Sequence, residues 1–392
     1  MKLVCVSNVL NNHSKSLCDE FYKTYKDDFC FIATQPYISK ENLKGGKVED
    51  FINEPYWVDG YSSKDKTIES LKICEEADVV LQFAAPDNYV RRRLKNNKLT
   101  FRVSERFYTG SKKDILRWIK YFCRYYSVKN KMLFFLASGA YASYDMRSAF
   151  AFKNKTYKWA YFPVIYKTES DIQIIKEVKK FEFLWVGRFI DLKKPEICIE
   201  IGKYLRNKGM NFTITMVGDG VEFDKIKKLV VENSLEKYFI FKGVKTNLEV
   251  QSMMDTADFL IFSSNKSEGW GAVLNEGMAN RCIPITSYAP GSVPFLIENG
   301  INGYIFDPDN LETLKKTLDK AVSLTVEDRN NMKNKSQATI LKIWSPKNAV
   351  HNLMMLIDSI NNGDKNPIKM GPASNAEIFN EKEFLDSLKT DK

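Results

Sequence analysis

Short apolar runs alternate with helix-like patterns of apolar and polar residues along most of this chain of 392 residues. In the first half, we expect strands at residues 3–7, 29–33, 79–83, 99–103 and 132–137. A second series begins at residues 181–188 and continues with F-T-I-T-M-V-G, Y-F-I-F-K-G, F-L-I-F and C-I-P-I-T. Because strands that alternate with helices usually pair in parallel, the pattern predicts an α/β fold with two parallel sheets.

The two series of strands indicate two doubly wound domains, since a chain of this length is too long for one ordinary core. We place the first domain at residues 1–168 and the second at 169–344. A serine at 345 that can cap a helix, followed by proline, predicts a helix over residues 345–360. The remaining residues, 361–392, are polar with little periodicity, so we expect a mobile tail with a short helix near 381–388.

The composition is that of a globular protein, with 44% hydrophobic and 28% charged residues. No apolar run approaches the roughly 20 residues that a membrane-spanning helix needs. The first residues resemble a strand and its loop more than a secretory signal. Seven cysteines without a C-x-x-C pair indicate neither a disulfide framework nor a zinc site. We therefore expect a cytoplasmic protein.

The net charge of +10 is concentrated in residues 101–160, where 13 Lys and Arg stand against 3 Asp and Glu. Four cations in this block follow a helical stripe, with apolar residues opposite: Lys113, Arg117, Lys120 and Arg124 against Ile115, Trp118, Ile119, Phe122 and Tyr126. This basic helix could face an anionic membrane surface, or its apolar side could meet the core of its own domain. No recognition motif supports nucleic acid as the partner.

An apolar run at residues 257–264 is followed by the segment E-G-W-G-A-V-L-N-E. This segment begins and ends with a glutamate, Glu268 and Glu276, with seven residues between them. Gly269 and Gly271 allow the backbone to approach a ligand closely, and a helix that begins here would present N–H groups to a phosphate. Eight positions are about two helical turns, so both carboxylates could face one ligand. An isolated pair of this kind would more often be two surface glutamates, so its surroundings must decide.

A second polar cluster, V-G-R-F-I-D-L-K-K, follows the first strand of the second series. Arg188 can form bidentate hydrogen bonds to phosphate, and Lys193 or Lys194 can add a compact positive charge. Together such cations would stabilise the negative charge on a departing nucleoside diphosphate. Alone, the cluster could equally be a surface arginine and its lysine neighbours.

The motifs G-R-x4-K, V-G-D-G at 217–220 and E-G-W-G-A-V-L-N-E-G-M-A occur in this order over residues 180–345. In order and spacing they resemble the donor domain of family 4 retaining glycosyltransferases of the GT-B fold. The resemblance of the first half is weaker. Its segments V-S-E-R-F-Y and Y-K-W-A-Y-F-P look like those of family members that build bacterial surface polysaccharides. The resemblance implies two Rossmann-like domains facing a cleft, with the C-terminal helix packing back on the N-terminal domain.

The same resemblance implies roles for individual residues. Arg188 and Lys193, after Gly187, look like ligands of the diphosphate, and Glu276 looks like a ligand of the ribose. Around the sugar and phosphates it places Glu268 with the backbone of Gly269, Trp270, Gly271 and Ala272, and beside the nucleobase it places Gly243 and Val244. Arg188, Lys193 and Glu268 are the catalytic candidates. Trp270 stands where the family often has Phe, and the loop at residues 8–14 lacks the family's Gly-Gly pair.

On the acceptor or sugar side, the candidates are His13, Glu105 and Arg106. His13 could equally be an ordinary loop histidine. The implied reaction moves a sugar from a nucleoside-diphosphate sugar to a hydroxyl of a saccharide or lipid-linked saccharide, with retention of configuration. It needs no cofactor or metal. We interpret D-P-D at residues 307–309 as a turn and not as a metal site.

Two other functions compete with glycosyl transfer. A nicotinamide-dependent oxidoreductase fits poorly, because Gly218 and Gly220 lack the third glycine of that motif and follow the second strand of their series. A non-catalytic nucleotide-sugar-binding or scaffold protein of the same fold remains open. The sequence leaves the sugar, the base, the acceptor and the oligomeric state undetermined.

Overall fold

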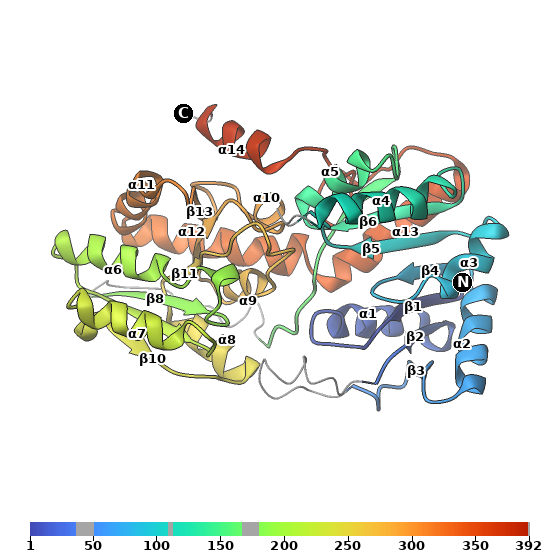
Figure 1. Ribbon diagram of the computed structural model, residues 1–392, viewed down its shortest axis with the longest axis horizontal. Helices are drawn as coiled ribbons and strands as arrows, with labels where there is room; N and C mark the ends of the chain where they lie inside the picture. The colour runs from blue at the N-terminus through green and yellow to red at the C-terminus, as the bar shows by residue number, and fades with distance from the viewer. Residues whose placement is uncertain (37–50, 109–112, 167–179, 391–392) are drawn as a thin grey trace. The chain divides into compact units, whose positions relative to one another are not determined.

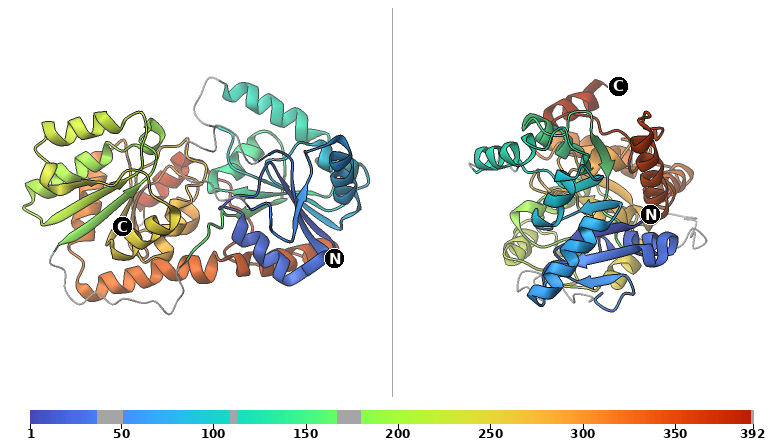
Figure 2. Two further views of the ribbon diagram at one scale, coloured as in Figure 1. Left: turned by 90° about the horizontal axis from the view of Figure 1, so that it is seen from below. Right: turned by 90° about the vertical axis from the view of Figure 1, so that its right-hand side faces the viewer.

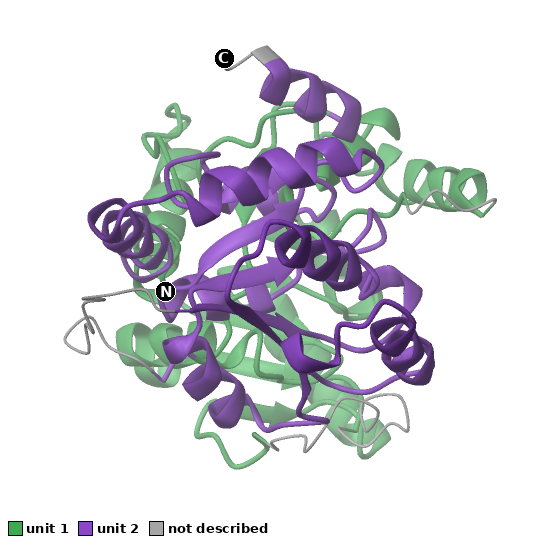
Figure 3. Cartoon of the chain, turned by 90° about the vertical axis from the view of Figure 1, so that its left-hand side faces the viewer, with its two compact units in different colours: residues 1–164, 343–379 green, residues 165–342, 380–392 purple. Residues whose placement is uncertain are grey.

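The computed structural model describes residues 1–36, 51–108, 113–166 and 180–390, and the chain divides into two compact units (Figure 3). Unit 1 comprises Met1–Val164 and Ile343–Phe379, and unit 2 comprises Ile165–Lys342 and Asn380–Lys392. Each unit is built on a parallel sheet with helices around it (Figure 1). The predicted α/β architecture with two Rossmann-like halves is confirmed.

Unit 1 contains a seven-stranded sheet in the order β3-β2-β1-β4-β5-β6-β7. Its strands are β1 (Leu3–Ser7), β2 (Phe29–Ala33), β3 (Trp57–Asp59), β4 (Val79–Gln82), β5 (Thr100–Ser104), β6 (Leu133–Ser138) and β7 (Thr156–Trp159). The helices of this part are α1 (Lys15–Tyr25), η1 (Lys26–Asp28), α2 (Lys64–Glu76), α3 (Asn88–Lys95), α4 (Asp114–Tyr126) and α5 (Ala140–Ser148). β1 and β2 have the bounds that the sequence predicts.

Unit 2 contains a six-stranded sheet in the order β10-β9-β8-β11-β12-β13. Its strands are β8 (Phe181–Val186), β9 (Phe212–Val217), β10 (Phe239–Phe241), β11 (Phe259–Phe262), β12 (Ile283–Ser287) and β13 (Tyr304–Phe306). The helices are η3 (Asp191–Lys193), α6 (Ile197–Asn207), α7 (Phe223–Glu232), η4 (Glu236–Tyr238), α8 (Asn247–Thr256), α9 (Val273–Ala279), α10 (Val293–Leu296), α11 (Leu311–Val322), α12 (Val326–Ala338) and α14 (Glu381–Thr390).

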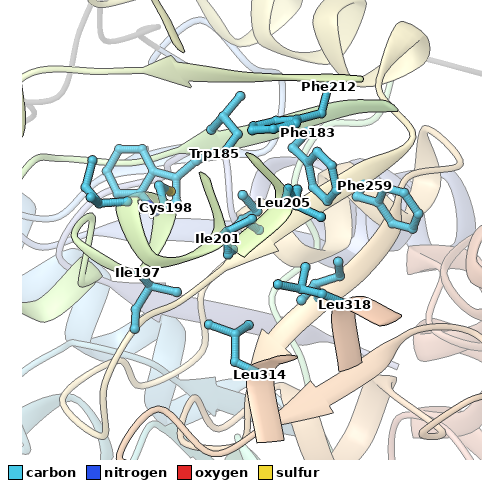
Figure 4. Close-up of a cluster of buried hydrophobic side chains, with 14 of the residues drawn as sticks. Phe183, Trp185, Ile197, Cys198, Ile201, Leu205, Phe212, Phe259, Leu314 and Leu318 are labelled. Atoms are coloured by element: carbon cyan, nitrogen blue, oxygen red, sulfur yellow. The ribbon is translucent and has the colours of Figure 1, made fainter. Parts of the chain in front are cut away.

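The core of unit 2 lies between this sheet and the helices that cover it (Figure 4). Alternate residues of the central strand β8, Phe183 and Trp185, point to the same face and meet Ile201 and Leu205 of α6. Burying side chains of this size contributes roughly 1.5–3 kcal/mol each. The packed sheet therefore gives the loops at its carboxyl edge a rigid base.

The C-terminal helix α13 (Pro346–Asn362) begins as predicted, with Ser345 as its cap and proline at its first position. It follows a π-helical segment, Thr339–Ile343, and belongs to unit 1. There it packs beside α1 (Figure 2). The Tyr25 hydroxyl of α1 contacts the Met354 sulfur. The predicted return of this helix to the N-terminal domain is confirmed.

The expectation of a mobile tail over residues 361–392 does not fit the segment that follows α13. Ala373 donates its N–H to Lys158 O at 2.8 Å, and Lys158 of β7 donates to Ser374 O at 2.7 Å. Ala373 and Ser374 are both buried. Backbone pairing with an edge strand thus holds a segment whose side chains are mostly polar. Further on, α14 occupies the place of the predicted short helix.

Candidate functional site

The loops that follow β8, β9 and β10 lie side by side at the carboxyl edge of the unit 2 sheet. Gly187 donates its N–H to Val217 O at 3.0 Å, and Gly218 donates to Gly243 O at 2.8 Å. Val244, which follows Gly243, is exposed. The residues proposed to bind the diphosphate and the base are therefore brought together by backbone hydrogen bonds.

Two glycines of the V-G-D-G motif allow this close approach. A Cβ on Gly218 would overlap the carbonyl oxygen of Gly187, and one on Gly220 would collide with the backbone of Phe189. Both glycines have positive φ, 129° and 156°, which side chains disfavour. The motif thus shapes the loop that carries Arg188.

Lys193 and Glu268 form an ion pair between the loop after β8 and the loop after β11. The Lys193 side chain is 17% exposed and that of Glu268 is 14% exposed. The backbone of Lys193 is fixed as well, because its carbonyl accepts a hydrogen bond of 2.7 Å from Ser263 Oγ. Trp185 Nε1 in turn donates to that hydroxyl at 3.1 Å. A buried chain of contacts therefore positions the pair.

Glu276 lies on α9, within the electrostatic reach of Lys193. Desolvation raises the pKa of its carboxyl to about 7, against the lowering effects of a hydrogen bond with Asn247 and of the Lys193 charge. Asn247 is held by Gln251, whose Nε2 donates to Asn247 Oδ1 at 2.9 Å. The sequence analysis missed Asn247. The Thr246–Glu249 capping box places it at the first position of α8 and could have drawn attention to it.

The two cations proposed alongside Lys193 differ in their surroundings. Arg188 is exposed, and its side chain forms no ion pair or hydrogen bond with another described residue. The preceding residue, Gly187, lies beside Lys193, because a Cβ on Gly187 would be 3.5 Å from Lys193 Cγ. Lys194 is paired with Asp191 and Glu196 instead. Arg188 is therefore available to a ligand, whereas Lys194 is engaged elsewhere.

Trp270 contributes only its backbone to this edge. Its side chain is fully buried, with Nε1 donating to Asn275 Oδ1 at 2.8 Å and the ring packed on Phe295. Gly271 has a φ of 87°, and a Cβ there would overlap the Phe262 ring. The tight turn from Gly269 to Ala272 thus presents its backbone next to Glu268.

In unit 1, the residues proposed for the acceptor side line one pocket of about 400 Å³ at the carboxyl ends of β1, β4, β5, β6 and β7. His13 stacks on Tyr161 with ring centroids 5.2 Å apart. Arg106 pairs with the buried Asp145 at 3.6 Å and lies over the Tyr141 ring. Glu105 lines the same pocket. The structure brings the three candidates together, although they come from two distant segments.

The arrangement expected for the basic helix is only partly correct. Of its cations, Lys113 and Lys120 are exposed, but Arg117 pairs with Asp114 at 2.8 Å and Arg124 pairs with Asp87. Among the apolar residues, Trp118 packs inward beside Tyr121 and Tyr125, and the indole donates to Ser148 O. In contrast, Ile115, Leu116 and Ile119 are 62%, 65% and 46% exposed. The helix therefore meets its own core with Trp118, Tyr121 and Tyr125, and it exposes Tyr126 together with the three aliphatic residues.

Asp307 and Asp309 form a turn, as expected, since Asp307 Oδ1 accepts the N–H of Asp309 at 3.0 Å. In the part of the chain that the structure describes, no cluster of His, Cys, Asp and Glu has the arrangement of a metal site. Nor does any described helix combine the length and apolarity needed to cross a membrane.

Residues 167–339 match the protein family Glycosyl transferases group 1. These residues form a glycosyl transferases group 1 domain. It contains every residue proposed above for the donor side, from Gly187 to Glu276.

Part of the chain is similar to proteins that are named as glycosyltransferases. Over 135 residues, the chain is 33% identical to the uncharacterized glycosyltransferase MJ1178 of Methanocaldococcus jannaschii, covering 34% of this chain and 36% of that protein. Over 140 residues, it is 26% identical to the amylovoran biosynthesis glycosyltransferase AmsK of Erwinia amylovora, covering 34% of each chain. The similarity spans about a third of the length of these curated relatives.

The fold extends beyond the group 1 domain. The Anabaena protein Alr3699/HepE, solved in complex with UDP, aligns with a TM-score of 0.66 over 92% of this chain and 100% of its own. Sequence identity is 14%, so this likeness concerns the fold. It confirms the predicted GT-B architecture.

Proposed function

We propose that the protein is a retaining glycosyltransferase that moves a sugar from a nucleoside-diphosphate sugar to an acceptor hydroxyl. The observation that carries this proposal is the convergence of Lys193, Glu268 and Glu276 at one edge of the group 1 domain, with Arg188 in the same loop as Lys193. HepE, which shares the fold, was crystallised with UDP and with UDP-glucose. A nucleotide-sugar donor is thus consistent with both the local chemistry and the relatives.

The site suits the departure of a nucleoside diphosphate. Arg188 and Lys193 would offset the charge that develops on the leaving phosphate as the sugar takes on oxocarbenium character. One such cation or donor typically accounts for about 3 kcal/mol of transition-state stabilisation. Because these two cations supply the positive charge, the proposed reaction requires no metal.

Retention of configuration follows if the leaving phosphate itself accepts the proton of the acceptor hydroxyl on the same face of the sugar. Glu268 would then hydrogen-bond the sugar, and Glu276 would accept hydrogen bonds from the ribose. Neither carboxylate needs to act as a nucleophile, unlike the pair in retaining glycosidases, which lies about 5 Å apart.

For the acceptor, we propose a lipid-linked saccharide of bacterial surface polysaccharide synthesis, in line with the name of AmsK. Docking at an anionic membrane would use α4, with Ile115, Leu116 and Ile119 entering the interface and Lys113 and Lys120 beside the head groups. The protein would then work as a peripheral protein on the cytoplasmic face.

Vesicle co-sedimentation tests this docking. Leu116→Ser should weaken binding to anionic vesicles roughly tenfold, since burial of a leucine contributes about 1.5–3 kcal/mol. Val231→Ser, at an apolar residue 60% exposed on α7, is the matched control. Equal binding of all three proteins, or no binding of the unmodified protein, would retire the membrane proposal.

Donor hydrolysis and transfer assays test the reaction. The unmodified protein should release nucleoside diphosphate, and Arg188→Ala and Glu268→Ala should each lower the rate roughly a hundredfold or more. An active protein that tolerates both substitutions contradicts the site. Donor binding without turnover would favour the non-catalytic alternative.

A further inference from the structure

The unit 1 pocket contains a buried arginine that forms no ion pair with a carboxylate of the described residues. Arg102 lies on β5 and is 7% exposed. Its Nη1 donates to Phe83 O, at the carboxyl end of β4, while its Nε has no hydrogen-bond partner among the described residues. A buried cation is normally retained only when a counter-charge or a full set of hydrogen bonds compensates for its lost hydration.

The carboxylates of the same region are committed elsewhere or exposed. Asp87, on the loop after β4, accepts hydrogen bonds from Gln82 and Arg124. Asp145 pairs with Arg106 and accepts the N–H groups of Phe107 and Tyr108 at 2.9 Å. One carboxylate, that of Glu105, belongs to a described residue that lines the pocket. Glu105 is partly exposed, so water screens its charge.

A second polar group in this pocket also lacks a partner. Ser138, at the end of β6, is 1% exposed, and its Oγ makes no hydrogen bond with the described part of the chain. Buried hydroxyls are rarely left in this state. Ser138 and Arg102 both line this pocket, which has a volume of about 400 Å³.

We propose that this pocket binds an anionic group of the acceptor, either a phosphate or a carboxylate. This inference rests on the proposed function, because it assigns the unit 1 pocket to the acceptor. Arg102 supplies the uncompensated guanidinium, and Arg106 stands in the same pocket. Guanidinium groups bind both kinds of oxyanion through paired, charge-assisted hydrogen bonds. The phosphates of a lipid carrier and the carboxylate of an acidic sugar are the two sources of such a group.

Calorimetric titration with pyrophosphate, D-glucuronate and D-glucose at constant ionic strength tests the site. Because the donor site would also bind pyrophosphate, the titrations use Arg188→Ala as the starting protein. We expect it to bind at least one of the two anions and to bind glucose at least tenfold more weakly. Tighter binding of pyrophosphate indicates a phosphate-bearing acceptor, and tighter binding of glucuronate indicates an acidic sugar.

Adding Arg102→Met should lower the affinity for the anion at least tenfold without lowering the Tm, because the substitution removes an uncompensated buried charge. Ser138→Ala, which keeps that charge, should lower the affinity severalfold. Adding Arg91→Met, at an exposed arginine of α3, is the matched control and should change nothing.

The inference is overturned if neither anion binds better than glucose, or if Arg102→Met and Ser138→Ala both leave the affinity for the anion intact. Anion binding that depends on Arg102 in a protein that transfers no sugar would support this site and contradict the proposed reaction, so the two failures are distinguishable.

Discussion

The ammonium group of Lys193 forms an ion pair with the carboxylate of Glu268 across two loops of the group 1 domain. Both side chains are largely buried, so the pair holds the lysine at the sheet edge in the absence of a ligand. A donor diphosphate would compete with Glu268 for the same cation. In the proposed reaction, Lys193 is therefore a charge held in place for the leaving group.

A double-mutant cycle measures this relationship. Lys193→Ala should destabilise unit 2 by about 1–3 kcal/mol, because it leaves the Glu268 carboxylate partly buried and unpaired. Glu268→Ala should have a similar effect, and the double variant should recover about 1 kcal/mol relative to the sum. Urea unfolding of the four proteins gives the coupling energy. Strictly additive losses would mean that the two groups do not interact in solution.

The raised pKa of Glu276 predicts a pH-dependent stability. As the pH rises from about 4.5 to about 7, the unfolded chain releases this proton and the folded chain keeps it, so stability falls through this window. Glu276→Gln removes the effect. The variant should therefore gain stability relative to the unmodified protein above pH 7 and lose that gain below pH 4.5. If the Tm difference between Glu276→Gln and the unmodified protein is the same at pH 4.5 and at pH 8, the result would contradict the desolvated state of Glu276.

Gly218 and Gly209 offer a matched test of the loop geometry. Both have positive φ, but a Cβ on Gly218 would overlap Gly187 O, whereas one on Gly209 would meet nothing within 4 Å. Gly218→Ala should displace the loop that carries Arg188 and weaken donor binding at least tenfold. Gly209→Ala should cost about 1 kcal/mol of stability from backbone strain alone and leave binding unchanged. Calorimetric titration with a nucleoside diphosphate compares them, and equal affinities would contradict the role of the motif.

Sequence patterns predicted the elements whose side chains are buried on both faces. β1 and β2 are continuous apolar runs bounded by polar residues, and their ends were found to the residue. β3, β7 and β13 were not predicted; each has only three or four residues and lies at an edge of its sheet. Such short strands depend on their neighbours in the sheet more than on their own sequence.

The polar contacts of the candidate site could be predicted only in part. Ordered motifs identified Arg188, Lys193, Glu268 and Glu276, but not the hydrogen bond from Asn247, which depends on how α8 and α9 pack. For α4, helical periodicity marked an apolar face but could not say which residues meet the core. Trp118 and Ile115 both lie on that face, yet one packs inward and the other is exposed.

Arg93 illustrates a structural role that the sequence did not reveal. This fully buried arginine donates to the carbonyl oxygens of Cys74, Ala77, Asp78 and Leu99, at 2.5 to 3.0 Å. Arg93→Ala would leave these acceptors without partners and should destabilise unit 1 by about 3 kcal/mol or more.

Its neighbour Arg92, with a side chain 79% exposed, provides the control. Arg92→Ala should change stability by less than about 0.5 kcal/mol. Urea unfolding followed by circular dichroism compares the two variants. Equal, small losses would mean that the carbonyl oxygens find water in place of the guanidinium.

Titration of nucleoside diphosphates into the unmodified protein, Arg188→Ala and Arg91→Ala tests the donor site itself. At least one nucleoside diphosphate should bind the unmodified protein, Arg188→Ala should weaken that binding at least tenfold without changing the Tm, and Arg91→Ala should bind it normally. Equal affinity in all three proteins, or no binding to the unmodified protein, would contradict a donor site built on Arg188, Lys193, Glu268 and Glu276.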